Sequence, residues 1–114
     1  METTPRFING VHGFTGQGLE TALPLGAPAY TVPSDRRAQP IYIRAGNSTA
    51  EMVAVMLMHD GKAIRTFPVG AKAGIHVPLA VVEDLQPDSV MEIYVAAPQG
   101  VSGQIVLDFG LLEI

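Results

Sequence analysis

The sequence predicts an all-β fold, an antiparallel β-sandwich of about seven or eight strands with a Gly-rich N-terminal arm. Three observations predict it. Twelve glycines and nine prolines divide the 114 residues into short segments, and those segments are rich in Val, Ile, Tyr and Phe, which favour strands. No segment keeps the apolar period of about 3.6 residues that a surface helix requires. A chain of this length forms one domain and buries a sufficient core without disulfides or metal ions.

Residues 1–27 differ from the remainder of the chain. They contain frequent glycines and prolines and show no sustained alternation of apolar and polar residues. Apolar side chains such as Phe7, Ile8 and Val11 argue against simple disorder, because disordered segments are poor in such residues. We therefore expect an arm or loop over residues 1–27 and a sandwich domain over residues 28–114.

Several stretches of the sandwich domain alternate apolar and polar residues, as half-buried strands do. In residues 89–96, for example, Ile93 and Val95 share one face and Tyr94 lies on the other. Gly110 interrupts the last apolar stretch, where glycine often marks a bulge or a close backbone contact. The strands expected on this basis are residues 30–32, 40–46, 75–79, 89–96 and 104–114, in addition to a hairpin.

The expected hairpin consists of residues 52–59 and 62–67, joined by Asp60-Gly61. Asp-Gly favours the two-residue type I′ turn, in which both turn residues have positive φ. Strict alternation on either side of the turn then sets the register of the two strands. The pairs expected from it are His59 with Lys62, Leu57 with Ile64, and Val55 with Thr66.

Both faces of this hairpin are apolar, whereas a sandwich strand usually has one dry face and one wet face. We assign the all-aliphatic face, with Val55, Leu57 and Ile64, to the core. One explanation for the second face is a strand covered on both sides within the chain, for example under the N-terminal segment. The explanation we favour is a subunit interface, because Met and Arg are frequent in interface cores. The candidate interface residues are Met52, Met56, Met58, Arg65 and Phe67.

Composition excludes several classes of partner. The net charge is −4 and the only basic cluster is Arg36-Arg37, so we expect no nucleic-acid partner. The N-terminus has no apolar targeting segment and no apolar stretch approaches the ~20 residues of a membrane span, so we expect no membrane association and a cytoplasmic location. The chain has no cysteine, which excludes disulfides and thiolate ligands.

Catalytic and metal-binding patterns are equally sparse. His12, His59 and His76 are the only histidines, and none has the His-x-His or His-x-x-x-His spacing that places two imidazoles together. No Gly-x-Ser-x-Gly motif provides a nucleophile. We therefore expect no catalytic residue, no metal site and no cofactor.

The Gly-rich stretch over residues 10–18 is the best candidate for a ligand loop. It lacks the Lys-Ser/Thr of a phosphate-binding loop and the strand-to-helix context of a dinucleotide site. A small-molecule or carbohydrate site would combine this loop with nearby tyrosines. The candidate ligand-binding residues are His12, Gly13, Gly16, Tyr42 and Tyr94.

Three functional hypotheses follow from these observations. The first is a non-enzymatic structural, assembly or accessory subunit that forms a homo-oligomer, or joins a larger protein assembly, through an apolar sheet face. The alternative is a small-molecule or carbohydrate binding module that uses the 10–18 loop. A further alternative is a small enzyme whose site forms between subunits.

Overall fold

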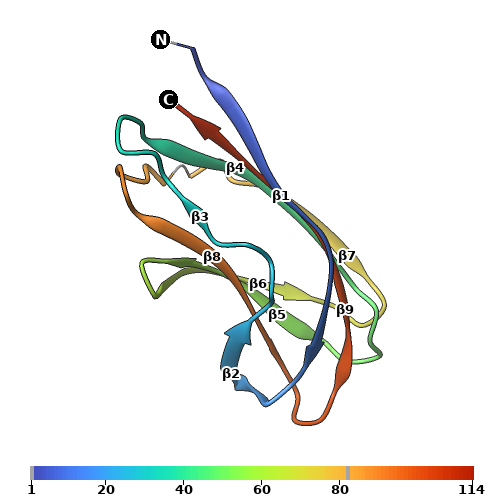
Figure 1. The fold of residues 1–114 in the computed structure, drawn as a ribbon. Coiled ribbons are helices and arrows are strands. Elements are labelled where there is room, and N and C mark those ends of the chain that lie inside the picture. The colour runs from blue at the N-terminus through green and yellow to red at the C-terminus, as the bar shows by residue number, and fades with distance from the viewer. Residues whose placement is uncertain (1, 82) are drawn as a thin grey trace.

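The structure is a computed structural model that describes residues 2–81 and 83–114. In these residues nine strands form two facing antiparallel sheets (Figure 1). The strands are β1 (Thr4–Thr15), β2 (Gly18–Pro24), β3 (Tyr30–Thr31), β4 (Ala38–Asn47), β5 (Val53–His59), β6 (Lys62–Val69), β7 (Gly74–Pro78), β8 (Val90–Ala97) and β9 (Ser102–Glu113). Sheet A has the order β1-β9-β4-β7, and sheet B the order β2-β8-β5-β6, with β3 also paired to β8. The expected all-β sandwich is confirmed.

The core lies between the two sheets. The alternation expected in β8 is confirmed, because Ile93 and Val95 are buried whereas Tyr94 is half-buried on the outer side. The well-patterned strands, such as β4, β5, β8 and β9, place one row of side chains in the core and leave the other row on the outside of the sandwich. The outer rows are therefore where a binding surface can form. The fully buried side chains include Ile43, Ile105 and Phe109 from sheet A and Leu57, Met91 and Ile93 from sheet B.

The Gly-rich N-terminal segment is built into the sandwich. Residues 1–27, expected as an arm or loop, instead contribute β1 to sheet A and β2 to sheet B. β1 pairs with β9 in an unbroken register from Thr4↔Glu113 to Thr15↔Ser102, so the ladder satisfies its backbone groups. The glycines that obscure alternation in the sequence permit the tight crossing between sheets, since a Cβ on Gly16 would overlap neighbouring carbonyl oxygens.

The hairpin turn between β5 and β6 has the expected conformation. Asp60 has a φ of 49° and Gly61 a φ of 81°, as a type I′ turn requires. The pairing of His59 with Lys62 beside the turn is also confirmed.

Beyond the turn, a β-bulge shifts the register of β5 and β6. Ile64 is the extra residue. Met58 pairs with Ala63, and the adjacent Leu57 pairs with Arg65, so Ile64 between them has no partner in β5. Ile64 and Phe67 are three positions apart, so strict alternation would turn only one of them inward. The bulge allows both side chains to pack on the core. The expected Leu57–Ile64 and Val55–Thr66 pairs are therefore wrong, and the observed pairs are Leu57↔Arg65 and Val55↔Phe67.

Asn47 holds the corner between β4 and β5. From its buried side chain, Nδ2 donates to the carbonyl oxygens of Glu51 at 2.8 Å and Gly70 at 3.1 Å. Its Oδ1 accepts a hydrogen bond from the backbone N–H of Thr49 at 2.9 Å. One side chain thereby ties the end of β4 in sheet A to the start of β5 and the end of β6 in sheet B.

Candidate functional site

The outer face of sheet B is almost entirely apolar. Its central row is Thr66, Met56 and Tyr94, which are paired across β6, β5 and β8. Glu92, beside Met58 toward the hairpin turn, is the only charged side chain among the outward residues of these strands. We call this surface the methionine face and define it by Met52, Ala54, Met56, Met58, Ala63, Thr66, Pro68, Glu92 and Tyr94.

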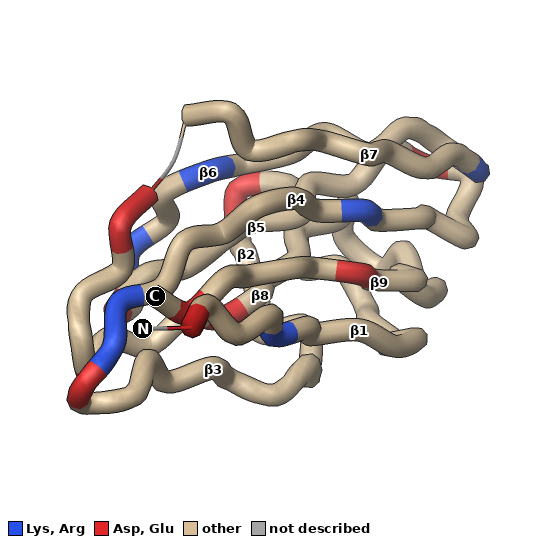
Figure 2. The backbone as a smooth tube through the Cα atoms, turned by 90° about the horizontal axis from the view of Figure 1, so that it is seen from above, with Lys and Arg blue, Asp and Glu red and all other residues tan. Residues whose placement is uncertain are grey.

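The methionine face forms the outside of the two-layer sandwich. Met52 is 49% exposed, and Met56, Met58 and Tyr94 are half-buried. The N-terminal segment does not cover this face, because β1 belongs to the opposite sheet and β2 lies beside β8 in the same layer. Figure 2 shows that charged residues gather at the end of the sandwich where the chain termini lie and are sparse along the strands.

Phe67 and Arg65, expected on the same face as the methionines, lie on the opposite side of the sheet. The bulge turns Phe67 into the core, where it is 4% exposed and paired with Val55. The guanidinium carbon of Arg65 lies 5.1 Å from the centre of the Phe67 ring, in a cation–π contact at the sheet edge. Of the candidate interface residues, only the three methionines lie on the methionine face. Tyr94, a candidate ligand-binding residue, lies on the same face.

The five candidate ligand residues lie at separate places. His12 lies on the inner side of β1, and its Nε2 has no hydrogen-bond partner in the described part of the chain. Gly13 lies within the β1–β9 ladder, and Gly16 packs against backbone carbonyls. Tyr42 and Tyr94 lie on the outer faces of opposite sheets. Residues 10–18 therefore form a strand and a tight turn, and the structure does not bring these five residues into one site.

The three histidines are also apart. His12 and His76 lie on β1 and β7, the opposite edges of sheet A, and His59 ends β5 in sheet B. Within residues 2–81 and 83–114, no three His, Asp or Glu side chains are grouped so that they could hold a metal ion. The same residues contain no helix of the length and hydropathy that crossing a membrane requires.

Tyr42 is the centre of a polar cluster on the outer face of sheet A. Its ring lies against Gly110, where a Cβ would overlap the ring, so this glycine accommodates a side chain rather than a neighbouring backbone. The Tyr42 O–H donates to Asp108 Oδ1 at 2.9 Å, and the Arg44 guanidinium carbon lies 5.4 Å from the ring centre. His76 meets the ring edge-on, with the ring centres 6.1 Å apart. Burial and the hydrogen bond to Asp108 raise the pKa of Tyr42.

An open depression of about 310 Å³ lies beside this cluster. Gly46 and Gly74, which lack side chains and pair across β4 and β7, line it together with Val106. Alternation in residues 40–46 already places Tyr42 and Arg44 on one face. The sequence does not reveal that β7 and β9 flank β4, and that arrangement brings in His76 and Asp108.

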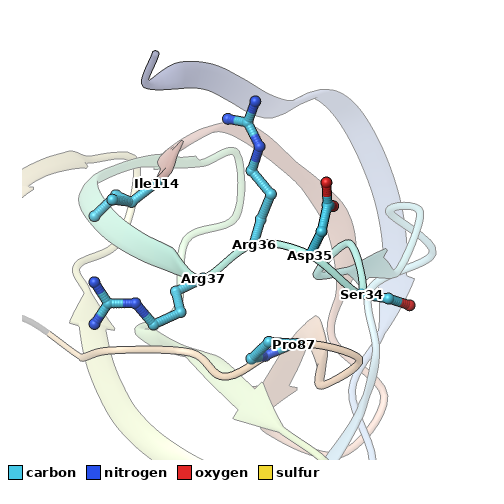
Figure 3. A pocket seen from close by; sticks show the side chains of 6 residues that line it. All are labelled: Ser34, Asp35, Arg36, Arg37, Pro87 and Ile114. Atoms are coloured by element: carbon cyan, nitrogen blue, oxygen red, sulfur yellow. The ribbon is translucent and has the colours of Figure 1, made fainter. Parts of the chain in front are cut away.

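A second depression, of about 380 Å³, lies at one end of the sandwich beside residues 34–37 (Figure 3). Two arginines line it, but both side chains are already engaged. Arg36 Nη1 donates to the carbonyl oxygen of Glu2 at 3.0 Å, and Arg37 Nη1 donates to Asp84 Oδ2 at 2.7 Å. Figure 3 shows the two guanidinium groups extending in different directions. They do not converge on a common anion, so we assign no ligand to this depression.

A buried carboxylate at the same end, Glu113 in β9, links the two sheets. It accepts a hydrogen bond from the Tyr30 O–H of β3 at 2.6 Å and pairs with Arg6 Nε of β1 at 3.2 Å. Burial alone would raise the pKa of Glu113, but the hydrogen bonds from Tyr30 and Arg6 and the charges of Arg6 and Arg36 lower it. Burial and the hydrogen bond to Glu113 raise the pKa of Tyr30. This satisfied network stabilises the end of the sandwich.

Comparison with known proteins identifies the fold and no family. No protein-family model matches the chain, and no curated protein matches its sequence. Among solved structures, the CBM36-1 domain of a multidomain xylanase from the hindgut metagenome of Trinervitermes trinervoides aligns over 96% of both chains, with 14% identity and a TM-score of 0.56. A carbohydrate-binding module CBM36 in complex with calcium and xylotriose aligns over 94% of this chain and 97% of its own, with 19% identity and a TM-score of 0.52.

A chain of infectious bursal disease virus, Gx strain, has a similar domain within a longer protein. It aligns over 98% of this chain but only 31% of its own length, with 12% identity and a TM-score of 0.54. At such low identities these likenesses establish the β-sandwich alone. The function of this chain has to be argued from its own surfaces.

Proposed function

We propose that this protein is a non-enzymatic structural subunit that assembles with copies of itself through the methionine face. The observation that carries the proposal is the composition of this face. Three methionines and Tyr94 lie on the outside of a two-layer sandwich with a single carboxylate among them. Contiguous apolar patches of this kind on a soluble domain mark interaction sites or aggregation liabilities.

Energetics favour covering this face. A large apolar side chain left in water forgoes roughly 1.5–3 kcal/mol relative to full burial, and Met52, Met56 and Met58 are all partly or largely exposed. β5 is flanked on both sides, by β8 and β6, so the centre of the face has no free backbone edge. Such a surface is suited to sheet-on-sheet packing, in which two sheets lie ~10 Å apart.

A second copy of the chain is the occupant that fits this face. Ala54 lies next to Met56 and leaves a shallow position into which a methionine of a facing copy can pack. Glu92 lies toward the hairpin end of the face, away from Ala54, where its carboxylate can stay hydrated at the rim. A two-fold contact uses the same patch on both copies, as homodimers commonly do.

The test is the molar mass in solution, measured by size-exclusion chromatography with light scattering. The wild type is expected to exceed the monomer mass of 12.1 kDa in a concentration-dependent way. Met56→Glu places a charge at the centre of the face and is expected to lower the mass while circular dichroism stays unchanged. Val81→Glu, at a loop side chain that is 78% exposed, is the matched control and is expected to leave the mass unchanged. A wild type that stays at the monomer mass at every concentration contradicts the proposal.

The second candidate function is the binding of a small polyhydroxylated ligand on the outer face of sheet A. The observation that favours it is the Tyr42 cluster, in which the ring contacts Asp108 and Arg44, two residues that line an open depression. Aromatic faces flanked by polar groups suit sugar rings, and a module of the same fold has been solved with xylotriose.

Affinity electrophoresis in gels containing soluble xylan tests this second candidate. Binding retards the wild type and not Tyr42→Ala, whereas Tyr94→Ala, on the opposite face, serves as the matched control and is retarded like the wild type. Equal mobility of all three proteins with and without polysaccharide contradicts xylan binding at this site.

A further inference from the structure

β1 is a long edge strand. Among the described residues it pairs as a strand with β9 alone, over 12 residues whose register never slips. The other sheet edges are interrupted. β6 carries Pro68 and the bulge at Ile64, β7 has five residues and ends at Pro78, and the register of β2 is irregular. Proteins normally blunt their edge strands in these ways, because an open row of backbone N–H and C=O groups is a template for another strand.

The middle of β1 lacks the charged residues and prolines that keep another strand away, although it contains Gly10, whose φ is 139°. From Phe7 to Phe14 it contains no Lys, Arg, Asp, Glu or Pro. Phe7 and Val11 are each 58% exposed, on the outer face of sheet A. Contacts with other parts of the chain lie near the start of β1, where Arg36 Nη1 donates to the Glu2 carbonyl oxygen and to Thr4 Oγ1.

We infer that the free edge of β1 pairs antiparallel with β1 of a second copy of this chain, so that sheet A continues from one copy into the other. A two-fold axis perpendicular to the sheet keeps outer side chains on the outer face of both copies. With the axis at Asn9, Phe7 lies opposite Val11 of the second copy, and Val11 lies opposite Phe7 of that copy. Directly opposed side chains in such a ladder have Cβ atoms about 4.5–5.5 Å apart, so the two exposed apolar side chains cover each other.

The register at Asn9 is favoured over its neighbours. An axis at Gly10 would place Phe7 opposite Gly13 and Val11 opposite Asn9, which leaves both apolar side chains without an apolar partner. An axis midway between two residues would oppose outer side chains to inner ones, which a continuous sheet does not allow. When the stretch Phe7–Asn9–Val11 is paired antiparallel with itself, each apolar side chain lies opposite another apolar side chain. This self-complementarity is why we infer a second copy as the occupant rather than an unrelated strand.

This contact does not depend on the methionine face, which lies on the other sheet. A subunit with both contacts would bind two neighbours through different surfaces and extend an assembly beyond a dimer. The two contacts can be separated experimentally, because Met56→Glu removes the first and leaves β1 unchanged.

Disulfide trapping tests the β1 contact, since the chain contains no cysteine of its own. Directly opposed residues in an antiparallel ladder have Cα atoms about 4.5–5.5 Å apart, within the range that a disulfide spans. Asn9→Cys, in the Met56→Glu background, places two thiols across the proposed axis. Val106→Cys is the matched control, because Val106 is 58% exposed on the same outer face, one strand inward. Its two copies would lie roughly 20 Å apart across the proposed sheet.

Mild oxidation followed by non-reducing electrophoresis gives the readout. Asn9→Cys is expected to yield at least ten times more covalent dimer than Val106→Cys, and adding Val11→Lys is expected to abolish the difference. Folded Asn9→Cys that stays monomeric, or equal cross-linking at both positions, overturns the inference. A methionine face that fails its own test leaves this result unaffected, so the failure of one contact is distinguishable from the failure of the other.

Discussion

Gly16→Ala is expected to destabilise the protein strongly, although Gly16 looks from the sequence like part of a loop. A Cβ at this position would lie 2.6 Å from the carbonyl oxygen of Ala97 and would also overlap that of Pro98. Relieving the overlap requires the backbone at this crossing to move. That movement weakens two hydrogen bonds, from Gly16 N to Val101 O at 2.7 Å and from Gly100 N to Gly16 O at 3.0 Å.

The magnitude follows from these contacts. Two backbone hydrogen bonds contribute about 0.5–1.5 kcal/mol each, and overpacking of a closed site costs about 1–3 kcal/mol. The expected loss in the free energy of unfolding is therefore about 2–6 kcal/mol. Urea titration followed by circular dichroism measures it, at matched protein concentration because association adds to apparent stability.

Gly13→Ala is the matched control. A Cβ at Gly13 has its nearest neighbour, the carbonyl oxygen of Gly103, at an ordinary 3.8 Å. Alanine in a strand interior is favoured over glycine by roughly 0.5–1 kcal/mol, so this variant should be neutral or slightly more stable. The reasoning is refuted if Gly16→Ala unfolds within about 1 kcal/mol of the wild type, or if Gly13→Ala is destabilised equally.

The remaining predictions also concern stability. Leu57→Ala should cost about 2–5 kcal/mol in urea titration, because Leu57 is 1% exposed in the core; a loss under about 1 kcal/mol would place it on the wrong face. Gly61→Val should cost about 1–3 kcal/mol and lower the melting temperature, because a β-branched residue is strained at a φ of 81°. Asn47→Ala should cost about 2–4 kcal/mol, because two partly buried carbonyl groups lose their donor, and an unchanged urea midpoint would contradict this. Stability should also fall as the pH drops below 4.5, the ordinary pKa of the Glu113 carboxyl, because the folded state lowers that pKa and favours the charged form. Tyr30→Phe removes one donor to Glu113 and should make this acid-induced loss shallower; an identical pH profile would show that Tyr30 does not set the pKa.

Much of the sandwich could be predicted because it depends on local physical chemistry. The two-residue period of β8 and β9 follows from the geometry of an extended chain, and Asp60-Gly61 forms its turn because both residues tolerate positive φ. The apolar face of the methionines is also a local property, since Met52, Met56 and Met58 are separated by even numbers of residues and therefore point to the same side of β5. Neither of these steps requires knowledge of distant contacts.

The candidate sites needed the tertiary structure, because their composition depends on which strands are neighbours. Tyr94 could be placed on an outer row from the sequence, but only the pairing of β8 with β5 puts it beside Met56. In the same way, Asp108 reaches Tyr42 only because β9 lies next to β4. Strand order depends on contacts between residues far apart in the chain, and no local pattern encodes it.

The sequence by itself therefore determined the class of fold, the hairpin turn and the alternation of each well-patterned strand. The tertiary structure decided the fate of Phe67, since burying both Ile64 and Phe67 against the opposite sheet requires a bulge that strict alternation does not contain. It also decided that the Gly-rich N-terminus is a strand, because β1 exists through its ladder with β9 at the other end of the chain. In both cases the deciding free energy comes from packing and hydrogen bonds with distant segments, which outweigh the local preferences that a sequence displays.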